Sequence, residues 1–267
     1  MEMNDFKGQA VFVAGGSSGI NLGIAKAFAA RGASVAIVSR SSERVAGAVA
    51  ELRALALPGA RIEGYSADVR DAEAIAAALA QAHAAIGDFD VLISGAAGNF
   101  VAPALGMSAK GFRTVIDIDL NGTFHVLRGA HEFLRKPGAS VISISAPQAY
   151  NPTMYQAHVC AAKAGVDMLT RVLAMEWGPQ GIRVNSIVPG PIGDTEGVRR
   201  LAPTPEAQMR MAATVPLRRM GTTQEIADMA LFLSSGRAQF VTGAVIPVDG
   251  GSSLHGGRDL GAAVAMQ

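Results

Sequence analysis

The stretch QAVFVAGGSSGINLGIAK, residues 9–26, places a run of apolar and β-branched residues directly before a glycine-rich loop. The apolar run up to Ala14 suits a buried strand, and after Ser18 the apolar residues recur with the spacing of a helix. Gly15 and Gly19 let the backbone turn tightly, and the amides at the start of the helix can donate hydrogen bonds to an anion. A helix-capping turn would use the same residues. Because this loop follows the first strand of the chain, however, the stretch predicts a βαβ unit whose loop binds the pyrophosphate of a dinucleotide.

The chain continues this alternation of short apolar runs and longer helical segments to about residue 248. Strands are expected at Gln9–Ala14, Ser34–Ser39, Arg61–Ser66, Val91–Ser94, Ser140–Ser145, Arg183–Val188 and Ala244–Val248. Helices are expected to begin near Ser18, Ser42, Asp71, Ser108, Asn121, Thr153 and Thr222. Strands joined by right-handed helical crossovers form a parallel sheet that is covered on both faces. The predicted fold class is therefore α/β, a single-domain doubly wound parallel sheet (Rossmann fold) over residues 1–267 with strand order 3-2-1-4-5-6-7.

Composition and charge exclude several classes of protein. The 267 residues are 49% hydrophobic and include 23 Lys plus Arg against 22 Asp plus Glu, a net charge of +1, which gives no electrostatic reason to bind nucleic acid or an anionic membrane. The only cysteine, Cys160, cannot form an intrachain disulfide, the first residues do not resemble a signal peptide, and no run approaches the ~20 apolar residues of a membrane helix. We therefore expect a cytoplasmic protein. The five histidines lack the spacing of a metal site, so no metal is expected.

A segment at about residues 189–216 interrupts the regular pattern. It is rich in proline and glycine, and it follows the sixth expected strand at the edge where open α/β sheets bind ligands. We interpret it as a substrate lid. The residues after Gly250 have no clear period and are not assigned to an element.

The end of the second expected strand, Val38-Ser39-Arg40-Ser41-Ser42, bears on the kind of dinucleotide. A domain that binds NAD usually has an acidic residue here, which accepts hydrogen bonds from the ribose hydroxyls. Arg40 and the neighbouring hydroxyls suit instead the additional 2′-phosphate of NADP, which a carboxylate would repel. The alternative is that Arg40 is a solvated residue at the start of a helix. We expect NADP(H), with Asp68 and Val69 placed after the third strand to meet the adenine ring.

Short motifs beyond the glycine-rich loop extend along nearly the whole chain. They are Asp68, Gly98, Ala161–Gly165 around Lys163, Arg183–Asn185, Pro189-Gly190 and Val248–Gly251. With these motifs the chain resembles the short-chain dehydrogenase/reductase family. The resemblance implies that Lys163 holds the nicotinamide ribose, that Pro189–Ile192 border the nicotinamide, and that Thr195 reaches the phosphates. The cofactor-binding residues expected are Gly15, Ser17, Ser18, Gly19, Ile20, Arg40, Ser41, Asp68, Val69, Ser94, Ala96, Gly98, Lys163, Pro189, Gly190, Ile192 and Thr195.

One departure from the family pattern concerns the proton donor. In the family's common form a tyrosine stands four residues before the lysine, and that position is Val159 here. Tyr155 lies eight residues before Lys163, about 12 Å along a helix, so it cannot simply replace the missing phenol. A carbonyl reductase needs an acid to protonate the alkoxide that forms as hydride arrives. Ordinary ketone and alcohol chemistry is therefore disfavoured.

Two further departures affect the loops that would border the cofactor. The third glycine of the family's phosphate loop is Asn21, and the usual Asn-Asn-Ala-Gly run is Ser94-Gly95-Ala96-Ala97-Gly98. We expect the local geometry of the cofactor site to differ from the common form at these two places.

One branch of the family accommodates most of these changes. The chain resembles the 2,4-dienoyl-CoA reductases, particularly the peroxisomal type, at Ala96–Phe100, Asp117–Asp119, Gln156–His158, Glu176–Pro179, Pro189–Ile192 and Thr195–Gly197. Members of that branch use NADPH to reduce a conjugated dienoyl thioester to a 3-enoyl thioester. Hydride added to the far end of the diene pushes charge onto the thioester oxygen, and the proton goes to carbon. Such a site needs an oxyanion donor and a positioned proton source rather than a phenol aimed at a carbonyl oxygen.

The resemblance to this branch also implies residue roles and partners. Asp119 and Lys163 are the expected catalytic pair, and the expected partner is an acyl-CoA or related thioester. A homo-oligomer is expected, with four copies as the expected number and the helices around Asn121–Arg135 and Thr153–Trp177 at the interface.

Other assignments stay open from the residues alone. Asp119 could instead be a polar residue that closes a helix turn, and Asn121 and Tyr150 are alternative proton sources. The alternative functions are the reduction or oxidation of carbonyl and alcohol substrates with Tyr150 or Tyr155 as the acid, the reduction of a 2-enoyl thioester, and dinucleotide binding without catalysis.

Overall fold

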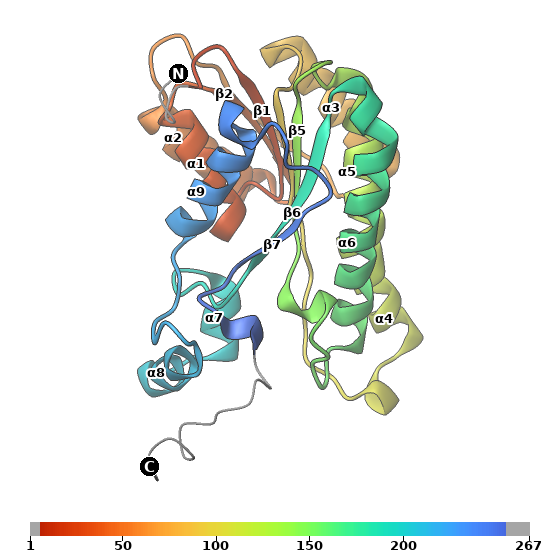
Figure 1. Cartoon of the computed structure of the whole chain (residues 1–267), viewed down its shortest axis with the longest axis vertical. Helices are drawn as coiled ribbons and strands as arrows, with labels where there is room; N and C mark the ends of the chain where they lie inside the picture. The colour runs from red at the N-terminus through yellow and green to blue at the C-terminus, as the bar shows by residue number, and fades with distance from the viewer. Residues whose placement is uncertain (1–5, 255–267) are drawn as a thin grey trace.

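A single parallel sheet forms the centre of the molecule in the computed structural model, which describes residues 6–254 (Figure 1). Its strands stand in the order β3-β2-β1-β4-β5-β6-β7, and every neighbouring pair is parallel. The strands are β1 Ala10–Ala14, β2 Ser34–Ser39, β3 Ile62–Ser66, β4 Val91–Ser94, β5 Ser140–Ile144, β6 Arg183–Pro189 and β7 Val245–Val248. The predicted fold class and strand order are confirmed.

Helices cover both faces of this sheet, as right-handed crossovers require. They are α1 Gly19–Ala29, α2 Ser42–Leu55, α3 Ala72–Ile86, α4 Ala109–Val115, α5 Gly122–Ala130, α6 Ala157–Trp177, α7 Glu196–Leu201, α8 Pro205–Thr214 and α9 Thr223–Ser234. In Figure 1, α1, α2 and α9 lie on one side of the sheet and α3, α5 and α6 on the other, while α7 and α8 lie beyond the carboxyl ends of the strands. The chain therefore has three layers, and the ends of the strands are left open on one edge.

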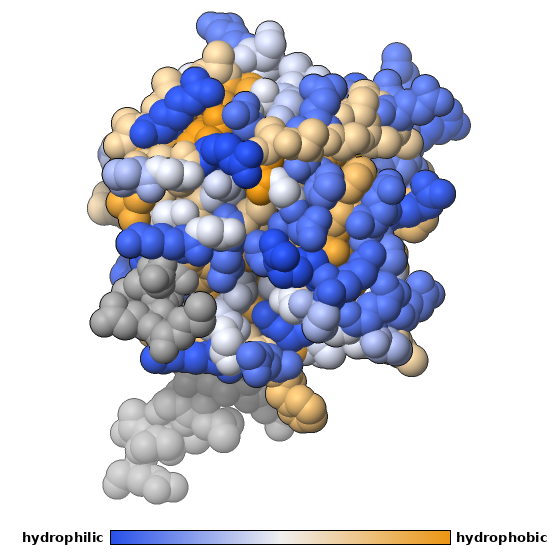
Figure 2. Space-filling model, turned by 90° about the horizontal axis from the view of Figure 1, so that it is seen from above, coloured by the Kyte–Doolittle hydropathy of each residue, from blue (hydrophilic) through white to orange (hydrophobic). Residues whose placement is uncertain are grey.

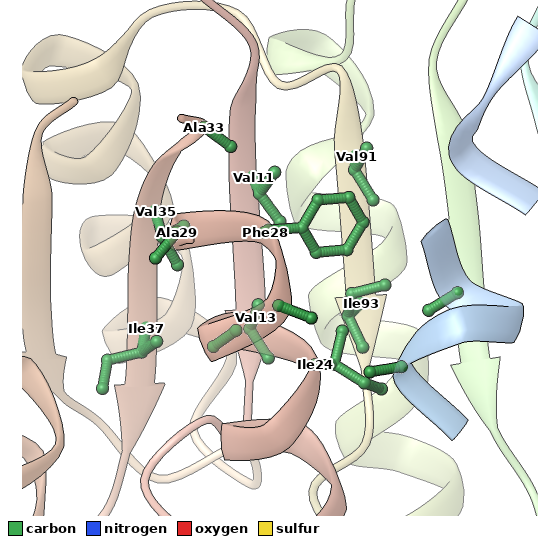
Figure 3. Close-up of a cluster of buried hydrophobic side chains, with 14 of the residues drawn as sticks. Val11, Val13, Ile24, Phe28, Ala29, Ala33, Val35, Ile37, Val91 and Ile93 are labelled. Atoms are coloured by element: carbon green, nitrogen blue, oxygen red, sulfur yellow. The ribbon is translucent and has the colours of Figure 1, made fainter. Parts of the chain in front are cut away.

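Alternate residues of the strands supply the two cores. Val11 and Val13 of β1 are fully buried against Ile24 and Phe28 of α1 (Figure 3), whereas Phe12, between them in sequence, faces the core on the other side of the sheet. Because successive side chains of a strand point to opposite faces, a strand buried on both sides must be apolar throughout. This explains why β1 reads AVFVA without a polar residue.

The predicted lid at residues 189–216 is only partly irregular. It contains α7 and α8, whose first turns are capped by the side chains of Thr195 and Thr204. A hydroxyl that accepts a hydrogen bond from an amide of the first turn satisfies a donor that the helix itself cannot pair. These two threonines start helices in a segment where the prolines and glycines suggested none, so the expectation of an irregular lid was wrong in this respect.

The helix that carries Lys163 begins later than expected. The sequence predicted a start near Thr153, but α6 begins at Ala157. Tyr155 has a φ of +64°, a left-handed conformation that an α-helix of L-residues cannot contain. The residues from Thr153 to Gln156 therefore form a turn, and the argument that placed Tyr155 two helical turns from Lys163 was wrong in its geometry.

The surface mixes polar and apolar residues. Figure 2, which views the molecule from above relative to Figure 1, shows hydrophilic side chains interspersed with smaller apolar areas on that face. Among the residues described, no helix has the length and apolar character needed to cross a membrane.

Candidate functional site

The glycine-rich loop after β1 forms an open cradle at the carboxyl edge of the sheet. Gly15 and Gly19 have φ values of +78° and +56°, and the amide of Gly15 donates to the carbonyl of Val38 in β2 at 2.8 Å. In the described part of the chain, the side chain of Ser18, the N-cap of α1, makes no capping hydrogen bond, so the first amides of this helix keep their donors for a ligand. A Cβ built on Gly19 meets only the methyl of Thr195, 4.0 Å away. The residues present therefore fit the pyrophosphate of a dinucleotide, held by backbone amides and the positive end of α1.

Positive charge gathers at the ends of β2 and β3. Arg40 is exposed at the end of β2, where its carbonyl accepts a hydrogen bond from the hydroxyl of Ser66 at 3.1 Å. Asp68 is paired with Arg70, whose Nη2 lies 2.6 Å from Oδ2. The hydrogen bonds from Arg70 lower the pKa of Asp68 and outweigh the effect of its burial, and the charge of Arg40 lowers it further. Two guanidinium groups thus flank one carboxylate at this end of the site.

The rest of the predicted adenosine-binding residues have defined places. Ser41 caps α2 by accepting from the amide of Arg44 at 3.3 Å. Val69 is buried, and a Cβ added to Gly122 of α5 would lie 2.7 Å from its side chain. The side chain of Val69 therefore packs against α5, and its backbone carbonyl accepts from Nδ1 of His125 at 2.8 Å.

Asp119 lies on a π-helical turn, Ile116–Asn121, between α4 and α5. Its Oδ1 accepts from the amide of Gly98 at 2.7 Å, and its Oδ2 lies 3.4 Å from Nζ of Lys163. Both side chains are buried, and Nζ also donates to the carbonyl of Ile144 at the end of β5, at 3.0 Å. Among the described residues no aligned donor reaches Oδ2, so the ion pair leaves this oxygen with an open hydrogen-bonding position. A single π-type turn often marks a functional site, and here it brings Asp119 to the lysine.

The position of the missing phenol is apolar in three dimensions as well as in sequence. Val159 is buried in a small cluster with Val115 and Ala162, between α6 and α4. Tyr155 and Tyr150 are both about half exposed, at the turn before α6 and after the short helix Pro147–Ala149. Asn121 donates its Nδ2 to Asp117 at 2.9 Å and is thereby engaged within the π turn.

A chain of three amides, which the sequence reasoning missed, borders this pair. Nε2 of Gln148 donates to Oε1 of Gln156 at 2.8 Å, and Nε2 of Gln156 donates to Oδ1 of Asn99 at 3.0 Å. Gln156 is buried, and the chain joins the loop after β4 to the loop after β5 and to the start of α6. No local motif signals it, because the three residues meet only when the sheet has formed.

A second polar group lies behind Lys163 and was also missed. Asp167, one turn further along α6, accepts from the hydroxyl of Ser186 in β6 at 3.0 Å. Burial raises the pKa of Asp167 above its ordinary value of 3.8, although hydrogen bonds and nearby cations oppose the shift. A spacing of four residues from a lysine is a signal for a shared helix face, but it does not predict burial.

His158 sits beside the same cluster. It is fully buried, its ring stacks at a tilt on Phe100 with centroids 4.2 Å apart, and burial lowers its pKa. His158 therefore has the surroundings of a histidine packed in the interior of the protein.

The remaining predicted residues surround the sheet edge. Ser94 is buried at the end of β4, and the hydroxyl of Thr195 donates to the carbonyl of Ile192 at 2.7 Å. The side chain of Ile192 packs into the core below α1 and α9. A Cβ on Gly190 would lie 2.6 Å from Cα of Asp249, so the glycine is needed for the close approach of β6 to the segment after β7.

A pocket of about 580 Å³ lies between residues 190–192, Pro216 and Leu217, and α9. It is on the α9 side of β6, whereas Asp119 and Lys163 come from helices on the opposite face of the sheet. The pocket and the Asp119–Lys163 pair therefore lie on opposite faces of the sheet. Among residues 6–254 no group of three or more His, Cys, Asp or Glu is arranged to hold a metal ion.

Comparisons with known proteins agree with this arrangement. The family model described as "Enoyl-(Acyl carrier protein) reductase" matches residues 14–253. The chain is 45% identical over 251 residues to the (3E)-enoyl-CoA-producing peroxisomal 2,4-dienoyl-CoA reductase of Rattus norvegicus, covering 94% of this chain and 85% of that protein. It is 38% identical over 250 residues to a Bacillus subtilis protein named "Probable 2,4-dienoyl-CoA reductase", (2E)-enoyl-CoA-producing, covering 92% of this chain and 97% of that one.

Solved structures give the same result for the fold. A short-chain type dehydrogenase/reductase from Mycobacterium ulcerans superimposes with a TM-score of 0.89 at 36% identity, covering 98% of this chain and 96% of that one. A short chain dehydrogenase from Bacillus anthracis gives a TM-score of 0.82, also at 36% identity, covering 94% of this chain and 99% of that one. The fold, the glycine-rich cradle and the sequence matches lead to one conclusion: the chain belongs to the short-chain dehydrogenase/reductase family of oxidoreductases.

Proposed function

We propose that this protein is an NADPH-dependent reductase of a conjugated acyl thioester, with a 2,4-dienoyl-CoA as substrate and a 3-enoyl-CoA as product. The observation that carries the proposal is the buried Asp119–Lys163 pair beside an apolar residue, Val159, at the place of the usual phenol. The printed names of the relatives from Rattus norvegicus and Bacillus subtilis support the same substrate class.

The division of labour in this proposal follows from the hydrogen bonds. The bound cofactor supplies hydride. Lys163, fixed by the carbonyl of Ile144 and by Asp119, donates to the ribose hydroxyls and carries positive charge near the reacting end of the substrate. Oδ2 of Asp119 has no aligned hydrogen bond among the described residues, and in this proposal it binds a water molecule. This water gives one proton to the carbon and takes a replacement proton from the solvent.

The oxyanion needs a donor, and the amide chain offers one. The side-chain oxygen of Asn99, Oδ1, accepts from Gln156. The side-chain nitrogen of Asn99, Nδ2, can only donate, and it is the last group of the amide chain. Asn99 is exposed and follows Gly98, the residue that binds Asp119. We therefore assign to Asn99 the hydrogen bond to the thioester oxygen, where negative charge develops.

The preference for NADPH rests on Arg40 and on the start of α2. A guanidinium group and the positive end of a helix stabilise the 2′-phosphate, and no carboxylate follows β2 at this position to repel it. Arg40→Ala should weaken NADPH binding about tenfold or more while changing NADH binding less than about threefold. Fluorescence titration with each nucleotide measures this, and equal losses for the two would contradict the preference.

The proposed activity is tested with purified protein and NADPH. We expect faster NADPH oxidation with 2,4-dienoyl-CoA than with 3-ketoacyl-CoA or a simple ketone. The reverse ranking would favour a carbonyl reductase that uses Tyr150 or Tyr155, and a preference for 2-enoyl-CoA would favour an enoyl thioester reductase. Nucleotide binding with no turnover of any of these substrates would favour a protein that binds the dinucleotide without catalysis.

Assembly and location belong to the same proposal. Phe124 of α5 and Met168, Val172 and Met175 of α6 are all exposed, which supports a homo-oligomer that uses these helices as its interface. The number of copies proposed is four. Light scattering on the purified chain checks this number.

We also propose that the segment at residues 189–216 acts as the substrate lid. The proposed location of the protein is the cytoplasm. Fractionation of cells that express the tagged protein tests the location.

A further inference from the structure

Two departures from the family pattern lie in contact with each other. Asn21 stands where the phosphate loop usually has its third glycine, and Gly95 belongs to the run Ser94–Gly98, which stands in place of the usual Asn-Asn-Ala-Gly. In the structure, Nδ2 of Asn21 donates to the carbonyl of Gly95 at 2.8 Å across 74 residues of sequence. Asn21 is in the first turn of α1 and is 8% exposed, so this hydrogen bond is largely shielded from water.

The side chain of Asn21 occupies the space that a side chain at position 95 would need. A Cβ built on Gly95 would lie 2.6 Å from Nδ2 and 2.7 Å from Cγ of Asn21, and closer still to Oδ1. Real Cβ atoms do not approach other atoms this closely, so one of the two groups would have to move. Gly95 is not among the residues with positive φ. Its backbone therefore does not itself require glycine, and the three atoms nearest to a Cβ at this position all belong to Asn21.

The same amide also lies against the phosphate loop. A Cβ on Gly15 would lie 3.0 Å from Nδ2 of Asn21 and 2.9 Å from the amide nitrogen of Ala96. The side chain of Asn21 is thus enclosed by two glycines, one in the loop after β1 and one in the loop after β4. Both loops contain residues that the proposed cofactor site uses, with Gly15 on one side and Ala96 on the other.

We propose that Asn21 and Gly95 are a matched pair that positions the dinucleotide. The side-chain amide of Asn21 fastens the first turn of α1, which supplies the free backbone donors, to the end of β4, and so fixes the distance between the two loops that bound the cofactor. Asn21 is a positioning residue, because it acts through the backbone on either side of it.

This inference rests on the proposed dinucleotide cofactor and not on the proposed thioester substrate. If the pair acts as a unit, the effect of a methyl group at position 95 must depend on the residue at position 21. Two groups in direct contact show such coupling, whereas independent sites have additive effects.

The test measures the Kd for NADPH by cofactor fluorescence on the full chain, in Gly95→Ala, Asn21→Ala and the double variant. We expect Gly95→Ala alone to raise Kd about tenfold or more, and Asn21→Ala alone to raise it about threefold to tenfold. In the double variant the added methyl group should cost less than about twofold relative to Asn21→Ala, because the space is then free. Gly47→Ala in α2 is the matched control, since a Cβ there meets nothing within 4 Å, and its Kd should stay that of the wild type.

The outcomes separate the possibilities. Equal costs of Gly95→Ala in the two backgrounds, or wild-type binding by Gly95→Ala, would overturn the pair. If Gly95→Ala does not fold, as judged by its thermal melt, the double variant must fold and bind NADPH, and its failure to do so overturns the proposal. A wild-type chain that binds neither NADPH nor NADH overturns this inference together with the cofactor assignment. Normal NADPH binding without turnover of 2,4-dienoyl-CoA counts against the substrate and leaves the pair to be judged by the Kd values.

Discussion

Asp119 joins two parts of the site: Oδ1 accepts from the amide of Gly98, and Oδ2 lies 3.4 Å from Nζ of Lys163, with no aligned hydrogen bond among the described residues. Asp119→Asn keeps the shape but replaces an acceptor by a donor that faces the lysine. We expect kcat with 2,4-dienoyl-CoA to fall by about 10²-fold to 10⁴-fold, the usual contribution of a positioned acid or base. The Kd for NADPH should change much less.

Asp117→Asn is the matched control for this variant. Asp117 lies on the same π turn and accepts from Asn121 rather than from Gly98. It should retain a kcat within about threefold of the wild type, because rates follow only the groups that act in the transition state. Equal losses in the two variants would mean that Asp119 contributes through the fold of the turn alone.

Val159 contributes packing and no chemistry in this account. Val159→Ala removes two methyl groups from the cluster with Val115 and Ala162, so the free energy of unfolding should fall by about 1–2 kcal/mol. The value of kcat should stay within about threefold of the wild type, because no transferred proton touches this side chain. Urea unfolding and steady-state kinetics measure the two quantities, and a collapse of kcat in a folded variant would give the residue a chemical role.

Asp167 gives the stability a dependence on pH. Burial raises the pKa of this carboxyl in the folded state above its ordinary value of 3.8, so the folded protein holds a proton that the unfolded chain releases as pH rises above 3.8. The contribution of Asp167 to the free energy of unfolding should therefore decrease as pH rises from 3.8 through the raised folded value. Asp167→Asn cannot titrate, so its stability relative to the wild type should increase over that window.

Urea unfolding of Asp167→Asn and the wild type at a series of pH values measures this difference. A free energy of unfolding of Asp167→Asn, minus that of the wild type, that is constant with pH or that decreases as pH rises would contradict the raised pKa. The side-chain carbonyl of the Asp167→Asn variant can still accept from Ser186, so the comparison changes charge more than hydrogen bonding.

At the scale of single elements, the strands could be predicted to within about one residue at each end. Their apolar, β-branched runs are buried on both faces, which makes the pattern distinctive. The start of α6 could not be predicted, because it depends on the left-handed conformation of Tyr155. The carbonyl of Tyr155 accepts from the amide of Ala102, which belongs to a loop distant in sequence. The amide chain and the Asn21–Gly95 contact were out of reach for the same reason, since each joins segments that are distant in sequence.

The segment at residues 189–216, the proposed substrate lid, contains a residue that should affect cofactor binding. The hydroxyl of Thr195 donates to Ile192 and accepts from Val198, while its methyl group faces the phosphate loop at Gly19. Thr195→Val removes both hydrogen bonds without changing the shape, and we expect KM for NADPH to rise about tenfold. Thr204→Val removes the equivalent cap of α8, and it should leave KM within about twofold. Similar values of KM for the two variants would contradict a contact between Thr195 and the phosphates.

At the scale of the whole molecule, the sheet order explains why residues from several different loops meet. Parallel strands bring all their carboxyl ends to one edge, so the loops after β1, β4 and β5 and the segment after β6 border one space. The sequence predicted this edge and the pair Asp119 and Lys163 correctly as neighbours. It could not indicate that a π turn would place Asp119 beside the lysine, because the sequence predicted helices beginning near Ser108 and Asn121 and the turn that joins them has no local motif.

The most direct test of the account is to run the reaction with 2,4-dienoyl-CoA and NADPH in D2O and to locate deuterium in the product by NMR. The control is 3-enoyl-CoA incubated with the enzyme in D2O without NADPH, which corrects for exchange. The account predicts a 3-enoyl product with one deuterium on the α-carbon, because the charge is held on the thioester oxygen and the proton is delivered to carbon. Deuterium on the fourth carbon of a 2-enoyl product, or an alcohol with no deuterium on carbon, would contradict it.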